Sequence, residues 1–174
     1  MEWHLKVILT IINLSILGYF IYCLIWFIAL FSPLLSEDLT LQSVIKEEYF
    51  SKGLDLAPYY IGLAFAFLNL LLHLYLIDKL LLARKVVAKI YSGVIIYQNQ
   101  PSDLKKVGAG FIVFAKLKYS LLMITGVFFY NDIHIFIAAL PQFLLFYLLG
   151  KLMLIIAIIS SKSEILQQEN ELTV

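Results

Sequence analysis

The chain has 174 residues, of which 62% are hydrophobic and only 14% are charged. Soluble proteins carry about a quarter of charged residues, so this composition excludes an ordinary water-soluble fold and indicates an integral membrane protein. We expect no direct binding of nucleic acid, because the net charge of +1 lacks the concentrated excess of Lys and Arg that phosphate binding needs.

The first hydrophobic run covers residues 7–31 and predicts the first transmembrane helix, since about 20 apolar residues suffice to cross the hydrocarbon core. Bulky residues precede Pro33 where a signal peptide would have a small-residue cleavage site, so we expect this helix to be retained. Cys23, the only cysteine, lies within the run, which predicts a buried and unreactive thiol. A single cysteine also excludes an internal disulfide and a cysteine-based zinc site.

Residues 32–57 form the predicted outer loop, in which acidic residues outnumber basic ones. Pro33 ends the first helix, because proline cannot sit inside a continuing helix. Apolar residues recur at roughly helical spacing between Leu39 and Phe50. This part of the loop therefore forms either a short amphipathic helix, lying on the outer bilayer surface or capping the bundle, or a plain acidic linker.

The second transmembrane helix is predicted over residues 58–79. Pro58 suits its first turn, where the missing N–H of proline costs nothing. The helical pattern continues past Lys79 into a basic connector, residues 80–106, until Gly93 supplies a helix stop. We therefore expect the second helix to protrude from the membrane.

The third transmembrane helix is predicted over residues 107–130. Its helix begins before the span, because Pro101 and the residues after it are typical of a helix start, with Ser102 as the N-cap. Asn131 and Asp132 predict the turn that ends it.

The fourth transmembrane helix is predicted over residues 133–159, with a kink at Pro141. Residues 160–174 follow as a polar and acidic tail. The sequence thus predicts an all-α integral membrane protein with four transmembrane helices and cytoplasmic helical extensions.

Basic residues are distributed unevenly over these segments and predict the topology. Eight lie on the side of the connector and the two termini, against two in the outer loop. By the positive-inside rule, the connector and both termini are expected in the cytoplasm. The eight are Lys6, Lys79, Arg84, Lys85, Lys89, Lys105, Lys106 and Lys162, and the two are Lys46 and Lys52.

Three further lysines, Lys116, Lys118 and Lys151, fall within apolar stretches, where a lysine costs about 2.5–3.5 kcal/mol near a helix centre. One interpretation places these lysines at the inner interface with the basic connector. In this collar the inner headgroup level passes through Lys79, Lys116 and Lys151, and each amine reaches water along its own side chain.

The alternative interpretation is a polar seam inside the membrane. Asn69 and His73 share one face of the second helix at spacing i, i+4, and Lys116 or Lys118 of the third helix would meet them. No carboxylate is expected at that depth.

No catalytic or metal-binding pattern stands out. His4, His73 and His134 fall at three different depths of the predicted bundle, and the sequence contains no H-E-x-x-H, C-x-x-C or G-x-S-x-G motif. We therefore expect no metal, no cofactor and no catalytic residues.

Two stretches resemble a known family. Residues 166–174 end the chain with a Leu followed by Glu-Asn-Glu-Leu-Thr-Val, and residues 90–95, Asn99 and residues 104–108 are similar to that family's middle loop. The family is the YoaS-like bacterial four-span membrane proteins, catalogued as domain-of-unknown-function family two-nine-seven-five. The resemblance implies a location in the bacterial inner membrane and brings no assigned activity. Because members are commonly encoded beside a small helix-turn-helix regulator, it also implies such a regulator as a cytoplasmic partner.

Two functional hypotheses follow. The first is a non-enzymatic membrane partner of a cytoplasmic protein, acting through its connector and an extended tail peptide, with the connector of a neighbouring subunit in a homo-oligomer as another target. The second is a small-substrate transporter or ligand-binding bundle that uses the polar seam. The tail residues of the first are Leu166, Glu169, Asn170, Glu171, Leu172, Thr173 and Val174, and the seam residues of the second are Asn69, His73, Lys116 and Lys118.

Overall fold

The computed structural model describes residues 2–31, 41–50, 59–93 and 99–172, and the side chains of residues 2, 42–43, 59 and 164–172 are not described. Within these ranges the chain forms helices and no strands, so the predicted all-α fold is confirmed. The helices are α1 (Glu2–Phe31), α2 (Leu41–Tyr49), α3 (Tyr59–Tyr91), α4 (Gln100–Phe129), α5 (Ile135–Ala138) and α6 (Leu140–Leu172).

Four segments of the described chain are long and apolar enough to cross a membrane. The longest helices, α3 and α6, have 33 residues each. At 1.5 Å per residue each is about 50 Å long, whereas the hydrocarbon core is about 30 Å thick. The chain is therefore a multi-pass membrane protein whose helices extend beyond the apolar layer. The four segments are Trp3–Phe31, Tyr60–Tyr91, Gln100–Phe129 and Ile135–Ser163.

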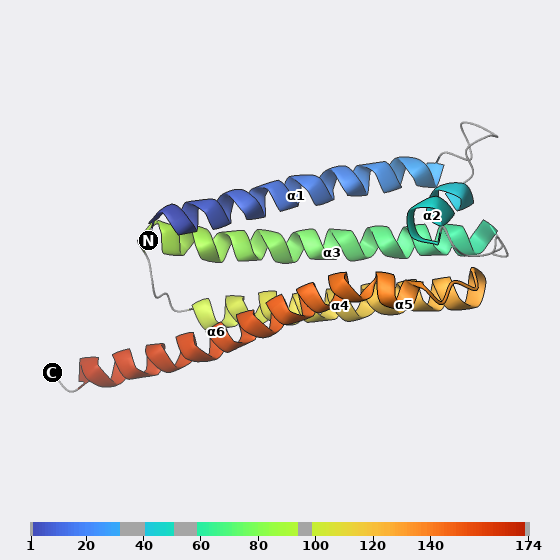
Figure 1. Cartoon of the computed structure of the whole chain (residues 1–174). Coiled ribbons are helices and arrows are strands. Elements are labelled where there is room, and N and C mark those ends of the chain that lie inside the picture. Colours follow the sequence, from blue (N-terminus) through green and yellow to red (C-terminus); the bar gives the residue numbers. More distant parts are fainter. Residues whose placement is uncertain (1, 32–40, 51–58, 94–98, 173–174) are drawn as a thin grey trace.

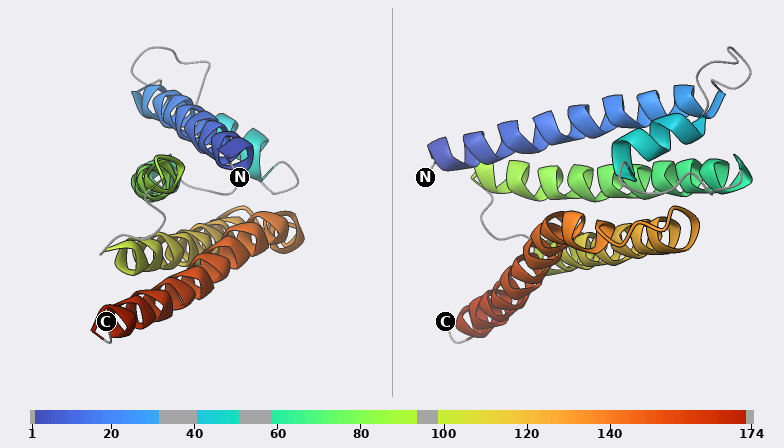
Figure 2. Two further views of the ribbon diagram at one scale, coloured as in Figure 1. Left: turned by 90° about the vertical axis from the view of Figure 1, so that its left-hand side faces the viewer. Right: turned by 45° about the vertical axis from the view of Figure 1, so that its right-hand side comes forward.

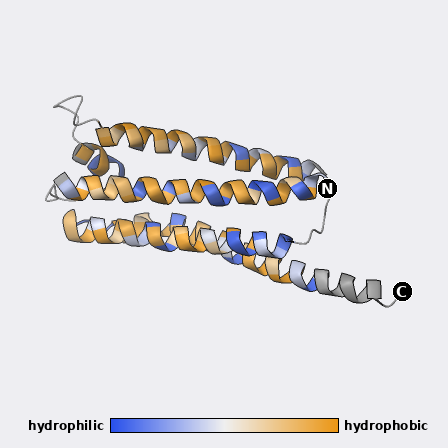
Figure 3. Cartoon of the chain, turned by 180° about the vertical axis from the view of Figure 1, so that it is seen from behind, coloured by the Kyte–Doolittle hydropathy of each residue, from blue (hydrophilic) through white to orange (hydrophobic). Residues whose placement is uncertain are grey.

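The long helices lie side by side in chain order (Figures 1 and 2). Their main contacts join α1 to α3, α3 to α4 and α4 to α6. We call this arrangement of the four long helices the row. Hydrophilic residues gather at the end of the row that holds the N-terminus, where α3 ends and α4 begins (Figure 3).

The contact between α4 and α6 depends on two glycines. A Cβ atom added to Gly108 would lie 2.8 Å from the backbone oxygen of Gly150, and one added to Gly150 would lie 2.7 Å from the backbone oxygen of Gly108. Glycine at both positions lets the two backbones approach closely, as small residues do in membrane helix pairs. Beyond this crossing, α6 diverges from the other helices toward its C-terminal end (Figure 2).

The outer loop contains a helix, α2, which decides between the two predicted alternatives. Leu41 and Ile45 of α2 are fully buried and pack with Phe50, Trp26 and Phe65 in one hydrophobic cluster. The residues therefore form neither a plain linker nor a helix lying flat on the bilayer surface, because their apolar side chains are covered by α1 and α3. Helix α2 caps one end of the row.

The ends of α3 and α4 differ in part from prediction. Helix α3 stops before Gly93, whose φ of +90° is a conformation that glycine adopts without steric cost, as predicted. Ser102 does not cap α4: the N-cap is Asn99, without a side-chain hydrogen bond, and its carbonyl accepts the first bond from Asp103 N–H at 3.0 Å. Pro101 sits in the first turn, where it needs no donor, so the helix can start before it.

The predicted fourth helix is divided in two. The turn at residues 131–132 is as predicted, with Asn131 at φ 49°. Helix α5 then ends at Ala138 and α6 begins at Leu140, so Pro141 lies in the first turn of a new helix and does not kink a continuous one. Proline has no N–H to bond the carbonyl one turn earlier, which favours a break just before it.

The tail is also different from prediction, because α6 continues to Leu172. Residues 160–172 include several Glu, Gln and Leu residues, which are strong helix formers, so the helix continues after the span. Pro33, Pro58, residues 94–98, Thr173 and Val174 lie outside the described residues.

Candidate functional site

Polar side chains gather around a cleft of about 250 Å³ between α1 and α6. Helices α3 and α4 contribute to its floor, and α2 contributes one wall. Lys118, at the floor, lies about midway along α4 between Lys106 and Phe129, so the cleft is near the middle of the membrane-spanning region. The residues that line the cleft are Tyr19, Tyr22, Glu48, Tyr49, His73, Lys118 and Gln142.

Helix α3 supplies two buried polar residues. Asn69 is fully buried and His73 is 3% exposed. They are one helical turn apart, and His73 Nδ1 donates to the backbone oxygen of Asn69 at 2.7 Å. A carbonyl oxygen can only accept, so this bond assigns the ring proton to Nδ1. The imidazole is enclosed by the rings of Tyr22 and Phe114, with centroids 4.7 and 5.7 Å away.

Lys118 is buried in the same place, with 4% of its surface exposed. Its amino group donates a hydrogen bond to Asn69 Oδ1 and another, at 3.4 Å, to the hydroxyl of Tyr49. The amine also lies 4.7 Å from the centre of the Tyr49 ring, within cation–π range. Lys118 thus makes the contact with Asn69 that the polar-seam alternative predicts and does not lie at the surface of the protein.

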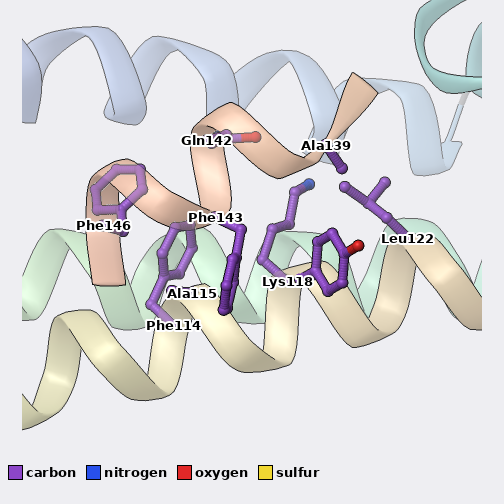
Figure 4. Close-up of a pocket in the computed structure, with 9 residues that line it drawn as sticks. Phe114, Ala115, Lys118, Leu122, Ala139, Gln142, Phe143 and Phe146 are labelled. Carbon is purple, nitrogen blue, oxygen red and sulfur yellow. The ribbon is translucent and has the colours of Figure 1, made fainter. Parts of the chain in front are cut away.

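Close to Lys118, side chains of α4 and α6 pack tightly (Figure 4). Phe114, Leu122 and Phe143 line a pocket beside the lysine stem, and the amine points away from the backbone of α4. The pocket there has a volume of about 10 Å³, roughly enough for one water molecule. The cleft of about 250 Å³, which Lys118 also lines, offers more room.

Tyr22 of α1 connects these groups to a carboxylate. Its hydroxyl donates a hydrogen bond to Glu48 Oε1 at 3.1 Å and forms another with the hydroxyl of Tyr49. It also accepts a hydrogen bond from the side-chain NH₂ group of Asn69 at 3.5 Å. A phenol has one proton, so if Tyr22 donates to Glu48, then Tyr49 donates to Tyr22. The bonds then run in one direction, from the Lys118 amine through two phenols to the Glu48 carboxylate.

The presence of Glu48 corrects the expectation that no carboxylate lies at this depth. Glu48 belongs to the outer loop in sequence, but the packing of α2 onto α1 and α3 carries it to the edge of the cleft. Burial raises the pKa of the neighbouring Tyr49, and Tyr22 raises it further. The Tyr49 hydroxyl therefore stays protonated and can donate a hydrogen bond. The sequence signal was the pair Glu48-Tyr49 at the end of a helical pattern.

Lys116 does not join the cluster. Residues two apart on a helix point in nearly opposite directions, and Lys116 is exposed where Lys118 is buried. Lys116 is also not level with the other lysines of the predicted collar. A Cβ atom on Gly110 would touch Lys79, and Lys116 lies six residues farther along α4, about 9 Å deeper.

Lys79 and Lys151 do lie at a similar level, because the Gly108–Gly150 crossing is next to Gly110. Each amine lies over the tyrosine four residues earlier on its own helix, at 4.9 Å from the centre of Tyr75 and 5.6 Å from that of Tyr147. Lys79 also pairs with Asp78 at 2.6 Å. The prediction that Lys79, Lys116 and Lys151 lie at one level is therefore wrong.

The other predicted residues lie far from the cleft. Arg84, Lys85 and Lys89 are on the last turns of α3, and Lys105 and Lys106 are on the first turns of α4. Leu166, Glu169, Asn170, Glu171 and Leu172 are on the last turns of α6, with side chains that are not described.

Chemically, the cluster is suited to binding charge and exchanging protons. Among the described residues no three of His, Cys, Asp and Glu lie together as metal ligands.

No family model, no curated protein and no solved structure matches the chain. The cleft joins a buried cation, a ring nitrogen and several hydroxyl and amide groups, which is a typical composition of a small-molecule binding site.

Proposed function

We propose that the chain is a non-enzymatic membrane protein that binds a small anion, such as a carboxylate, in the cleft beside Lys118. The burial of the Lys118 amine is the observation that supports this best. Its direct partners are a neutral amide and a neutral phenol, and Glu48 is reached only through hydroxyl groups. A buried cation without a directly paired anion is costly, and an anion bound in the cleft would offset that cost.

The size of the cleft limits the ligand. About 250 Å³ is slightly smaller than pockets for drug-sized molecules, which have about 300–1,000 Å³. Small carboxylates fit this volume. Gln142 and His73 on the cleft wall offer further hydrogen bonds, which would give the site selectivity among anions.

We propose that the ligand enters from the side of the membrane that carries α2, because Glu48 and Tyr49 form that wall. With the basic end in the cytoplasm by the positive-inside rule, this is the outer face. The resemblance to YoaS-like proteins supports the bacterial inner membrane as the location, and the positive-inside rule supports a cytoplasmic position for both termini.

The proposal is tested by measuring ligand-dependent stability. Purified full-length protein would be heated in detergent with acetate, pyruvate or succinate, and affinity measured by calorimetry for any compound that raises the melting temperature. We expect at least one to stabilise the native protein and the exposed control Lys116→Met. Lys118→Met should lose about tenfold or more in affinity, the effect of one hydrogen bond to a charged group.

An unchanged response of Lys118→Met, or no response of the native protein to any of the three anions, would contradict the proposal. If Lys118→Met alone does not fold, the double variant with Asn69→Leu removes the unpaired amide and serves in its place.

A second candidate function is supported by the ends of α3 and α6. We propose that these extensions bind a cytoplasmic protein, such as the helix-turn-helix regulator implied by the family resemblance, or a second copy of the chain. The tail would act as a helix and not as an extended peptide. Capture of such a regulator by the full chain but not by a chain truncated after Ser163 is the expected result, and equal capture by both would argue against this function.

A further inference from the structure

A second cavity, of about 600 Å³, lies between α4 and α6 at the basic end of the row. It is distinct from the cleft beside Lys118 and has a different lining. Its residues are Pro101, Ser102 and Lys105 of α4, and Leu154, Ala157, Ile158 and Ser161 of α6.

The cavity follows from the way the two helices cross. Gly108 and Gly150 bring the backbones together, and from this point the start of α4 and the end of α6 separate. Below the gap, Val86, Leu104 and Ala157 form a small buried cluster that ties α3, α4 and α6 together. The result is a groove with a closed floor, open toward the surroundings of the protein.

The groove has a polar part and an apolar part. Ser102, Lys105 and Ser161 form its polar part, whereas Leu154 and Ile158 form its apolar part. The sequence changes from polar to apolar after residue 106 on α4 and from apolar to polar at residue 160 on α6, and the lining of the groove includes residues at both boundaries. Such a boundary on a membrane-spanning helix marks the level of the lipid headgroups.

The charge at this level is positive. Lys105 lines the groove, Lys106 and Lys162 are exposed next to it in sequence, and Asp103 is the acidic residue of the first turn of α4. Basic side chains at the membrane surface attract anionic lipids. Ile158, with 59% of its surface exposed, would face acyl chains at no cost.

We propose that this groove binds an anionic phospholipid of the leaflet at the basic end of the protein. The lipid phosphate accepts hydrogen bonds from Lys105, Ser102 and Ser161, and one acyl chain lies along Leu154 and Ile158. The combination of a phosphate acceptor and an apolar chain matches both parts of the groove. A soluble phosphate would leave the apolar part bare, and an apolar peptide would leave Lys105 without an anion.

The experiment uses the full-length protein, delipidated in detergent and titrated with phosphatidylglycerol, phosphatidylcholine or glycerol 3-phosphate while bound lipid is counted by native mass spectrometry. We expect tighter binding of phosphatidylglycerol than of phosphatidylcholine by about tenfold, since only the former adds a net charge at Lys105. Lys105→Gln should abolish this preference. Lys106→Gln, which removes the same charge from a residue that does not line the groove, should keep most of it.

A second variant, Ile158→Trp, fills the apolar part while leaving the charge intact, and should weaken binding of both phospholipids. Equal binding of the two phospholipids by the native protein would overturn the proposal. It would also be overturned by a Lys105→Gln variant that keeps the preference, or by glycerol 3-phosphate displacing phosphatidylglycerol completely at equal concentration, which would indicate a site for a soluble phosphate.

Discussion

Lys118 and Asn69 act as a pair, because each satisfies a demand that the other creates. The buried Lys118 amine donates a hydrogen bond to Asn69 Oδ1, and the NH₂ group of Asn69 donates one to the Tyr22 hydroxyl. Removing one member of such a pair leaves the other unsatisfied, which costs more than removing both.

We expect Asn69→Leu to lower the free energy of unfolding by about 2 kcal/mol, because the Lys118 amine loses its nearest acceptor. Adding Lys118→Met in that background should restore most of the loss, since both polar groups are then gone. Unfolding in detergent measures both values. Additive effects of the two substitutions would show that the pair is not energetically coupled.

Gly150 gives a second test at the scale of a single residue. A methyl group there would lie 2.7 Å from the backbone oxygen of Gly108, and backbone cannot move aside as a side chain can. Gly150→Ala should therefore lower the melting temperature, with a loss of about 1–3 kcal/mol from overpacking. Gly18→Ala is the matched control: nothing lies within 4 Å of its added Cβ, so it should be neutral or stabilising by up to about 1 kcal/mol. A destabilisation as large at Gly18 would exclude the close crossing as the cause.

At the scale of elements, α2 links the outer loop to the bundle. Ile45 is fully buried in the cluster with Trp26 and Phe65, whereas Glu47 is exposed on the same helix. We expect Ile45→Ala to cost about 2–5 kcal/mol, the range for a large buried aliphatic residue, and Glu47→Ala to change stability little. Thermal unfolding compares the two. A negligible effect of Ile45→Ala would mean that α2 lies free on the bilayer surface.

The elements also show how far the sequence could predict this molecule. The long helices follow from hydropathy, because an apolar run in a bilayer has few alternatives to a helix. The place of α2 could not be predicted, since its apolar face fits a bilayer surface as well as a protein groove. In the same way, Lys116 and Lys118 are equivalent by composition, and only the rotation of α4 against α3 decides which one is buried.

Glu48 was missed for a related reason. Its distance in sequence from Asn69 and Lys118 hides a closeness that arises from the folding of α2 back onto the row. For Pro141, by contrast, the sequence correctly predicts an interruption of the fourth helix, but as a kink where the structure has a break. The break is favoured because a proline in the first turn of a helix costs nothing, whereas one inside a helix costs about 3 kcal/mol.

At the scale of the whole molecule, the two ends of the row are chemically different. One end is closed by α2 and by aromatic residues such as Phe50 and Tyr130, whose rings stack with centroids 4.6 Å apart. The other end carries the basic residues of α3 and α4 (Figure 3) and the C-terminal part of α6 (Figure 1). A ligand that reaches Lys118 past α2 and a lipid that reaches Lys105 would thus come from opposite faces of the membrane.

This separation can be tested with thiol labelling in intact cells. In a Cys23→Ala background, Glu47→Cys places the only thiol on α2 and Lys106→Cys places it at the basic end, and both native side chains are exposed. We expect a membrane-impermeant maleimide to label Glu47→Cys directly and Lys106→Cys only after the cells are permeabilised, because the eight-to-two distribution of basic residues favours a cytoplasmic connector. The reverse pattern would invert the molecule, so that the cleft of Lys118 would take its ligand from the cytoplasm and the groove of Lys105 would contact the outer leaflet.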